Sequence, residues 1–157
     1  MKISNIQLDF EGQTINGFTF IPTDSEVKTI AVITHGYTSH KGSILSWCIR
    51  LCESGVSCVL FDLPGHYIGT FSEVQSLESF QNGAPELFIK AYSKLKEAIT
   101  DTDLSKWKLV LAGHSLGALL SLKASTYPEL NQQKSQYILC VGFGLPPKGV
   151  THVFDTP

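Results

Sequence analysis

Residues 108–124, which read KLVLAGHSLGALLSLKA, decide the fold of this protein. The apolar run Lys108–Ala112 predicts a buried strand, and the apolar segment Leu116–Ala124 predicts a helix packed against a sheet. Between them lies the motif GHSLG, in which a glycine stands two residues to either side of the serine. This pattern is typical of a strained strand-to-helix turn that pushes the serine hydroxyl outward, over the positive end of the helix. We therefore predict that Ser115 is a nucleophile.

Three other apolar runs, Thr29–Thr34, Ser57–Asp62 and Tyr137–Gly142, have the same near-continuous character. Strands that are covered by helices on both faces show this pattern, because neither face meets water. Helical periodicity appears between the runs, over Ile44–Ser54 and Pro85–Ile99. Strands that alternate with helices predict an α/β fold with a doubly wound, mostly parallel sheet.

The N-terminal segment shows a different pattern. Polar and apolar side chains alternate over Asn5–Phe10 and Thr14–Ile21, and the tripeptide Glu11-Gly12-Gln13 separates the two runs. Two alternating runs joined by a short turn that contains glycine predict an antiparallel hairpin at a sheet edge. The polar stretch Ser72–Gly83 predicts a loop with at most one short helix. We expect a single domain over residues 1–157.

Composition and charge argue against several classes of function. The 157 residues carry a net charge of −2, and neither lysine nor arginine forms a block, which argues against nucleic acid as a partner. No apolar run reaches the roughly 20 residues of a membrane span, and the N-terminus lacks the apolar stretch of a secretory signal. We expect a cytoplasmic protein with no integral membrane association. The sequence does not indicate an oligomeric state.

The four cysteines do not form the pattern of a disulfide framework or of a metal site. Cys48 and Cys52 fall on one face of a predicted helix, whereas Cys58 and Cys140 lie within apolar strand patterns. We predict that all four are buried, reduced thiols. No cofactor and no metal ion is expected.

A second motif, His35-Gly36-Tyr37, follows the apolar run Thr29–Thr34 directly. A serine nucleophile that attacks a carbonyl group needs two N–H donors for the oxyanion that forms. We predict that the backbone N–H groups of Tyr37 and Leu116 are these donors. We interpret His35 and Gly36 as structural parts of the loop, since a histidine base would have to bond to the serine itself.

Three motifs in this order, HGYT at residues 35–38, DLPGH at residues 62–66 and GHSLG at residues 113–117, resemble the α/β-hydrolase superfamily. The likeness is to its branch of serine hydrolases, which includes small esterases and proteins similar to monoacylglycerol lipase. The branches that break carbon–halogen bonds or epoxides carry an aspartate where this chain has Ser115, so the resemblance disfavours them.

The resemblance also implies roles for residues within these motifs. It implies that Gly113, His114 and Gly117 shape the turn around the nucleophile, and that Asp62 and His66 are part of the scaffold. The substrate that it implies is a small-molecule ester or thioester.

In this superfamily an acid and then a histidine follow the serine along the chain, so the resemblance implies both beyond Ser115. Only residues 116–157 follow it, and each strand–helix–strand unit takes roughly 30 residues. We therefore expect the acid and the histidine to lie beyond Pro157, and this chain to be the N-terminal part of a longer protein. Asp155 and His152 are weaker candidates. We expect residues 143–157 to begin a lid or cap instead.

The motifs imply hydrolysis of a carboxylic ester or thioester through an acyl-enzyme at Ser115. Acyl transfer to another acceptor, and cleavage of a peptide bond, would use the same residues. A chain that truly ends at Pro157 would lack the base, and would then be a non-catalytic binding protein with a hydrolase fold.

Overall fold

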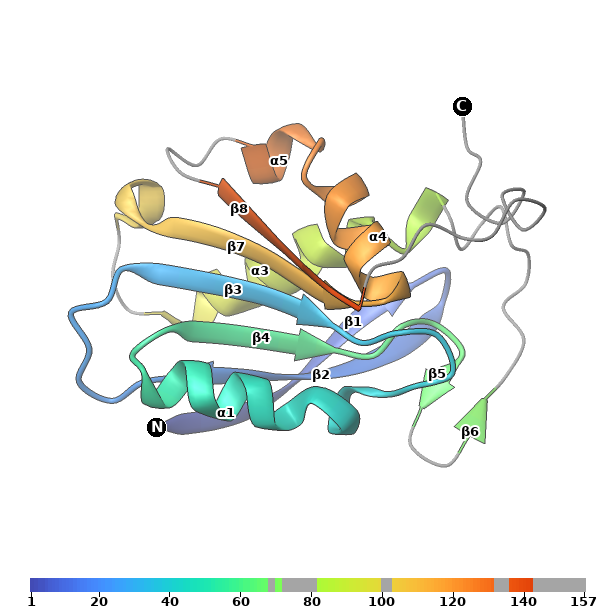
Figure 1. Cartoon of the computed structure of the whole chain (residues 1–157), viewed down its shortest axis with the longest axis horizontal. Helices are drawn as coiled ribbons and strands as arrows, with labels where there is room; N and C mark the ends of the chain where they lie inside the picture. The colour runs from blue at the N-terminus through green and yellow to red at the C-terminus, as the bar shows by residue number, and fades with distance from the viewer. Residues whose placement is uncertain (68–69, 72–81, 100–102, 132–135, 143–157) are drawn as a thin grey trace.

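A six-stranded mixed sheet lies at the centre of the computed structural model, which describes residues 1–67, 70–71, 82–99, 103–131 and 136–142 (Figure 1). Its strands run in the order β1 (Lys2–Phe10), β2 (Gln13–Ile21), β4 (Ser57–Phe61), β3 (Thr29–Thr34), β7 (Lys108–His114) and β8 (Gln136–Val141). The helices and 3₁₀ turns are η1 (Lys41–Ile44), α1 (Leu45–Glu53), α3 (Glu86–Ala98), η2 (Leu104–Lys106), α4 (Leu116–Ala124) and α5 (Pro128–Asn131). A small separate hairpin is formed by β5 (His66–Tyr67) and β6 (Thr70–Phe71).

The N-terminal hairpin is present as predicted, although β1 already begins at Lys2. β1 and β2 pair antiparallel, and β2 also pairs antiparallel with β4. The turn between β1 and β2 consists of Glu11 and Gly12, which both have positive φ angles, 49° and 77°. Two successive positive φ angles give a turn whose twist matches that of the strands, and glycine adopts this conformation at little cost.

The parallel half of the sheet confirms the predicted doubly wound arrangement. β4, β3, β7 and β8 are parallel to one another. Thr34, the last residue of β3, pairs with both Phe61 of β4 and Gly113 of β7. The three strands therefore end at the same edge of the sheet. The loops that follow them lie side by side there, at the edge where sheets of this kind bind ligands.

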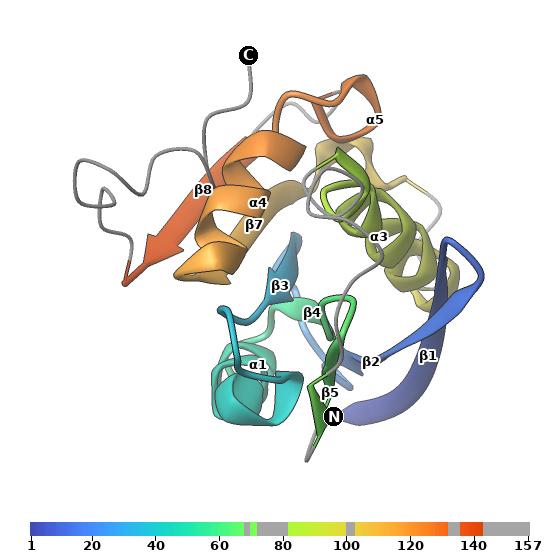
Figure 2. The same cartoon turned by 90° about the vertical axis from the view of Figure 1, so that its right-hand side faces the viewer.

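Helices cover both faces of the sheet. Figure 2 shows α1 on one side and α3 and α4 on the other. Successive residues of β3 point into two different cores, Ile30 and Val32 towards α3 and α4, and Ala31 and Ile33 towards α1. Because β3 and β4 are buried on both faces, their sequences are almost continuously apolar, as predicted.

β8 departs from the prediction that it is covered on both faces. Most of its residues are exposed, including Tyr137 and Cys140. β8 is the edge strand of the described sheet, and α4 packs against one face of it. The prediction that Cys140 is a buried thiol is therefore wrong, whereas Cys48, Cys52 and Cys58 are buried between α1 and β4 as predicted.

Some predictions lie outside the described residues. They are the lid or cap over residues 143–157, with the candidates His152 and Asp155, and most of the loop predicted over residues 72–83. Within the part of the chain that the structure describes, no helix combines the length and apolar character that a membrane crossing requires.

The larger core predicts a strong dependence of stability on Phe88 of α3. Its ring is fully buried and meets the ring of Phe61 edge to face, with 5.2 Å between the ring centroids. We expect Phe88→Ala to lower the free energy of unfolding in urea by about 3–5 kcal/mol, because it leaves a cavity and removes an aromatic pair. On the same helix, Glu97→Ala removes an exposed ion pair with Lys94, so a change below about 1 kcal/mol is expected. Equal effects of the two substitutions would contradict the packing described.

Candidate active site

Ser115 occupies the sharp turn between a strand and a helix that the sequence predicts. β7 ends at His114 and α4 begins at Leu116, so Ser115 is the single residue between them. Its backbone has φ 51° and ψ −113°, a conformation that a residue with a side chain adopts only under strain. Its N–H donates to the carbonyl of Val141 at 2.9 Å, and its own carbonyl accepts from the Ala118 N–H at 3.0 Å. These two bonds hold the strained backbone between β8 and the first turn of α4.

The two glycines of the motif permit the close approach of α4 to the sheet. A Cβ on Gly113 would overlap the carbonyl carbon of Gly117. A Cβ on Gly117 would lie 2.5 Å from the carbonyl oxygen of His35 and 2.8 Å from that of Thr34. Because backbone atoms fill both places, any larger residue would displace the helix from the end of β3.

The loop that follows β3, residues 36–40, lies against this turn, and it is called the oxyanion loop below after the role that the sequence predicts for the Tyr37 N–H. A Cβ on Gly36 would lie 3.1 Å from Ser115 Cβ and 2.9 Å from His114 Nδ1. Leu116 is the first residue of α4, and N–H groups in the first turn of a helix have no partner within that helix. The Tyr37 side chain is 61% exposed. The structure thus brings together Ser115, Leu116 and the loop that carries Tyr37.

His35 is fully buried, and both of its ring nitrogens are engaged. Leu63 N–H donates to His35 Nε2 at 3.0 Å, so the ring proton lies on Nδ1, which donates to the Gly36 carbonyl at 2.8 Å. Burial, which the bond to Gly36 only partly offsets, lowers the pKa of His35 from 6.5 to about 4. His35 is therefore a neutral structural group at physiological pH, and its nitrogens have no capacity to bond to Ser115.

A buried ion pair lies at the other end of the oxyanion loop. Asp62, directly after β4, is fully buried and accepts the Lys41 N–H at 2.7 Å through Oδ1 and the Lys41 ammonium through Oδ2. His66 is also buried, and its Nδ1 bonds to the Pro64 carbonyl at 2.8 Å. Lys41 has no signal in the sequence, since lysine is almost never fully buried and no local pattern marks the exception.

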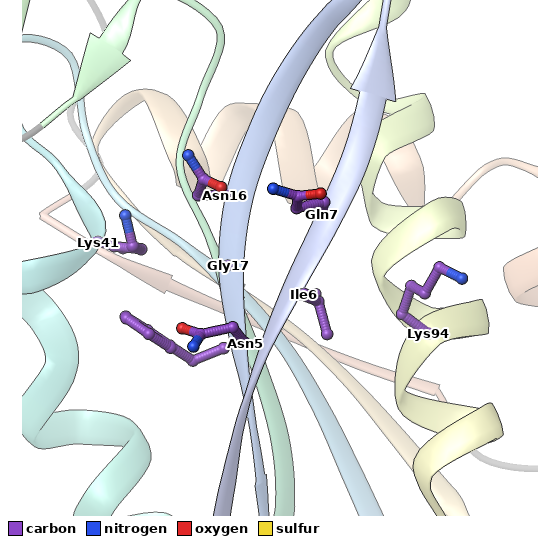
Figure 3. Close-up of a pocket in the computed structure, with 8 residues that line it drawn as sticks. Asn5, Ile6, Gln7, Asn16, Gly17, Lys41 and Lys94 are labelled. Carbon is purple, nitrogen blue, oxygen red and sulfur yellow. The ribbon is translucent and has the colours of Figure 1, made fainter.

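A hollow of about 730 Å³ lies elsewhere, over the N-terminal hairpin. Residues of β1 and β2 line it together with Lys41 and Lys94 (Figure 3). Figure 3 shows these two lysines on opposite sides of the hairpin, so they do not converge on one ligand. Ser115 is not among the lining residues. The convergence of backbone and side-chain groups at Ser115, and not this hollow, marks the candidate site.

Comparison with protein families identifies the chain. The family model described as "Serine aminopeptidase, S33" matches residues 25–147, which include the oxyanion loop, Asp62 and the GHSLG motif. The chain belongs to this family. It is an α/β hydrolase, as the resemblance of its motifs implied. A comparison with curated protein sequences finds no match.

Solved structures of α/β hydrolases share the fold. A highly thermostable carboxyl esterase from Bacillus coagulans is 17% identical, with a TM-score of 0.69 over 89% of this chain and 44% of that one. The thioesterase domain from the curacin biosynthetic pathway is 20% identical, with a TM-score of 0.62 over 97% of this chain and 50% of that one. A lidless α/β serine hydrolase from Xanthomonas campestris is 20% identical, with a TM-score of 0.61 over 95% of this chain and 63% of that one. This chain therefore spans about half the length of the first two structures.

The low pKa of His35 makes stability depend on pH. As the pH falls, the unfolded chain protonates this histidine near its ordinary value of 6.5, whereas the folded protein resists until about 4. The contribution of neutral His35 to the stability of the fold is therefore fully present above pH 6.5, and it is lost as the pH falls towards 4. Since one pKa unit corresponds to about 1.4 kcal/mol, we expect a loss of about 3 kcal/mol from this residue across that window.

Urea unfolding at a series of pH values between 7 and 4 measures this effect. The variant His35→Gln should lose some stability at pH 7 but show a flatter dependence, because its amide does not titrate. The control His114→Gln, at an exposed neighbour, should keep the wild-type fall in stability. A wild-type slope in the His35→Gln variant would show that this histidine is not the group responsible.

Proposed function

We propose that the full-length protein hydrolyses a carboxylic ester or thioester through an acyl-enzyme at Ser115. The observation that carries this proposal is the strained backbone of Ser115 at the β7–α4 junction, with the oxyanion loop packed against it. A strained turn that costs stability is retained where its geometry serves a function, and a strand-to-helix turn of this kind presents a serine hydroxyl for attack.

The reaction follows from this geometry. Ser115 Oγ attacks the substrate carbonyl, and its proton passes to a histidine outside the described residues, oriented by an acid that is also outside them. His152 and Asp155 remain candidates for these two roles. The N–H groups of Leu116 and Tyr37 bind the oxyanion of the tetrahedral intermediate, and the positive end of α4 stabilises the same charge. The intermediate collapses to the acyl-enzyme and expels an alcohol or thiol, which takes the proton from the histidine. Water then attacks the acyl-enzyme in the reverse sequence and releases the acid.

The substrate class is supported by the solved structures of similar fold, which include a carboxyl esterase and a thioesterase domain. A second candidate is the hydrolysis of an amino-terminal peptide bond, which the description of the family favours. Both reactions use the same nucleophile and oxyanion donors, so they differ in the leaving group and in what holds the rest of the substrate.

A fluorophosphonate probe tests the nucleophile in the full-length protein. The probe should label the wild type, and Ser115→Ala should abolish labelling and lower kcat/KM for p-nitrophenyl esters by about 10⁴-fold or more. Ser125→Ala is a matched control, since this serine directly follows the same helix and its hydroxyl donates to the Leu122 carbonyl at 2.7 Å. Labelling that survives in Ser115→Ala would refute the assignment.

The same preparation separates the candidate functions. A higher kcat/KM for p-nitrophenyl acetate or butyrate and for an acyl thioester than for aminoacyl p-nitroanilides is the expected result. The reverse preference would favour the peptidase. A folded wild-type protein that reacts with neither the probe nor any substrate would favour a non-catalytic binding protein.

A further inference from the structure

We infer that Lys41 and Asp62 form a buried clamp that positions the oxyanion loop, and that Lys41 is therefore a positioning residue for catalysis at Ser115. The catalytic part of this inference rests on the function proposed above, whereas the structural part does not. Neither residue belongs to the strained turn itself, and they act through the backbone of residues 36–40.

The two ends of the oxyanion loop are tied to the same short segment after β4. At the first end, Leu63 N–H donates to the ring of His35 at 3.0 Å. At the second end, Asp62 holds both the backbone N–H and the ammonium group of Lys41. Because Asp62 and Leu63 are consecutive, one rigid segment sets where the loop leaves the sheet and where it enters η1.

That segment is itself fixed relative to Ser115. Thr34 pairs with Phe61 on one side and with Gly113 on the other, and its hydroxyl donates to the Phe61 carbonyl at 2.9 Å. The strand register that places Ser115 at the end of β7 therefore also fixes the position of Asp62 at the end of β4. A loop clamped to Asp62 is held at a defined distance from the nucleophile.

The electrostatics make this clamp stiff. Asp62 is fully buried and the Lys41 side chain is only 10% exposed, so a shift of the loop would separate two charges where little water can solvate them. Among the described residues, the pair also faces the His35 ring, whose Nε2 lies 3.5 Å from Asp62 Oδ1, and the Phe18 ring, whose centroid lies 5.5 Å from Lys41 Nζ. Neither replaces the ion pair, since His35 is neutral and the ring of Phe18 offers only a weak cation–π contact.

Between its ends, the oxyanion loop is held by further contacts: the Tyr37 ring meets the His66 ring with 5.4 Å between the centroids, and the Ser39 hydroxyl lies 2.6 Å from that of Ser43. Ser39 N–H reaches the Gly36 carbonyl at 3.3 Å, Thr38 has a positive φ of 55°, and the side chains of Tyr37 and Thr38 are exposed. An oxyanion donor is effective only over a distance range about 0.4 Å wide, and a Cβ on Gly36 would already lie 3.1 Å from Ser115 Cβ. The position of the Tyr37 N–H therefore depends on the anchors at the two ends together with these contacts.

The decisive variant removes both charges together. In Lys41→Met/Asp62→Asn, the amide oxygen still accepts the backbone N–H at position 41, and no lone charge stays buried, so folding is preserved. Lys41→Met and Asp62→Asn alone each leave one unpaired buried charge and should be less stable. Lys41→Arg keeps the charge and should retain more activity than Lys41→Met. Lys94→Met, at an exposed lysine of α3, is the control.

Three readouts on the full-length variants distinguish positioning from general stability. We expect the double variant to lower kcat for p-nitrophenyl butyrate by about 10- to 100-fold, with KM changed by less than about 3-fold. Inhibition by a trifluoromethyl ketone, which forms the oxyanion on Ser115, should weaken in parallel with kcat. Amide hydrogen exchange should accelerate over residues 36–40 while α4 keeps its protection.

Two results would overturn the inference. One is unchanged exchange over residues 36–40 in the folded double variant. The other is exchange that accelerates equally throughout the protein, because a purely structural pair would act on the whole domain. If the wild type hydrolyses no ester, the proposed function fails, and hydrogen exchange alone then decides whether the pair clamps the loop.

Discussion

The site depends on one close approach, that of the first turn of α4 to the end of β3. Gly117 lies so near the carbonyl oxygens of Thr34 and His35 that a Cβ there would lie 2.8 Å and 2.5 Å from them. This contact fixes the start of α4 over the sheet and forces Ser115 into a backbone conformation that costs roughly 1–3 kcal/mol. The pairing of the strands keeps this strained conformation in place, because β3 and β7 end side by side and leave a single position for the turn. Ser115 is thus held by packing and by the bonds of its backbone to Val141 and Ala118.

The same edge of the sheet also holds a buried negative charge, that of Asp62, which is paired with Lys41. Asp62 is the buried carboxylate among the described residues there, and Lys41 neutralises it from within the protein. His35 stays neutral, because burial keeps its pKa at about 4. In the reaction proposed above, a lone carboxylate in this position would oppose the negative charge that develops on a carbonyl bound at Ser115. The ion pair therefore serves both the geometry of the oxyanion loop and the electrostatics of the edge.

Much of the fold could be predicted from the sequence, because most strands and helices have a local pattern of apolar residues that indicates them. The continuous apolar runs reflect strands buried on both faces, and the alternation before Ile21 reflects a hairpin at the sheet edge. The exposure of β8 could not be predicted in this way. Its sequence has the same apolar character as β3, but its exposure depends on whether another element covers its outer face, which is a property of neighbours in space.

In the candidate site, too, some features could be predicted from local sequence and others depend on contacts between distant residues. The sequence by itself determined the α/β architecture, the GHSLG turn and the loop that begins at His35, because each is a short motif with one compatible local geometry. Only the tertiary structure decided that burial keeps His35 neutral, with Leu63 N–H bonded to its ring, and that Lys41 is buried on Asp62. These contacts join residues 21 or more positions apart, so no periodicity or spacing encodes them. They arise when parallel strands end in register and bring separate loops to one edge of the sheet.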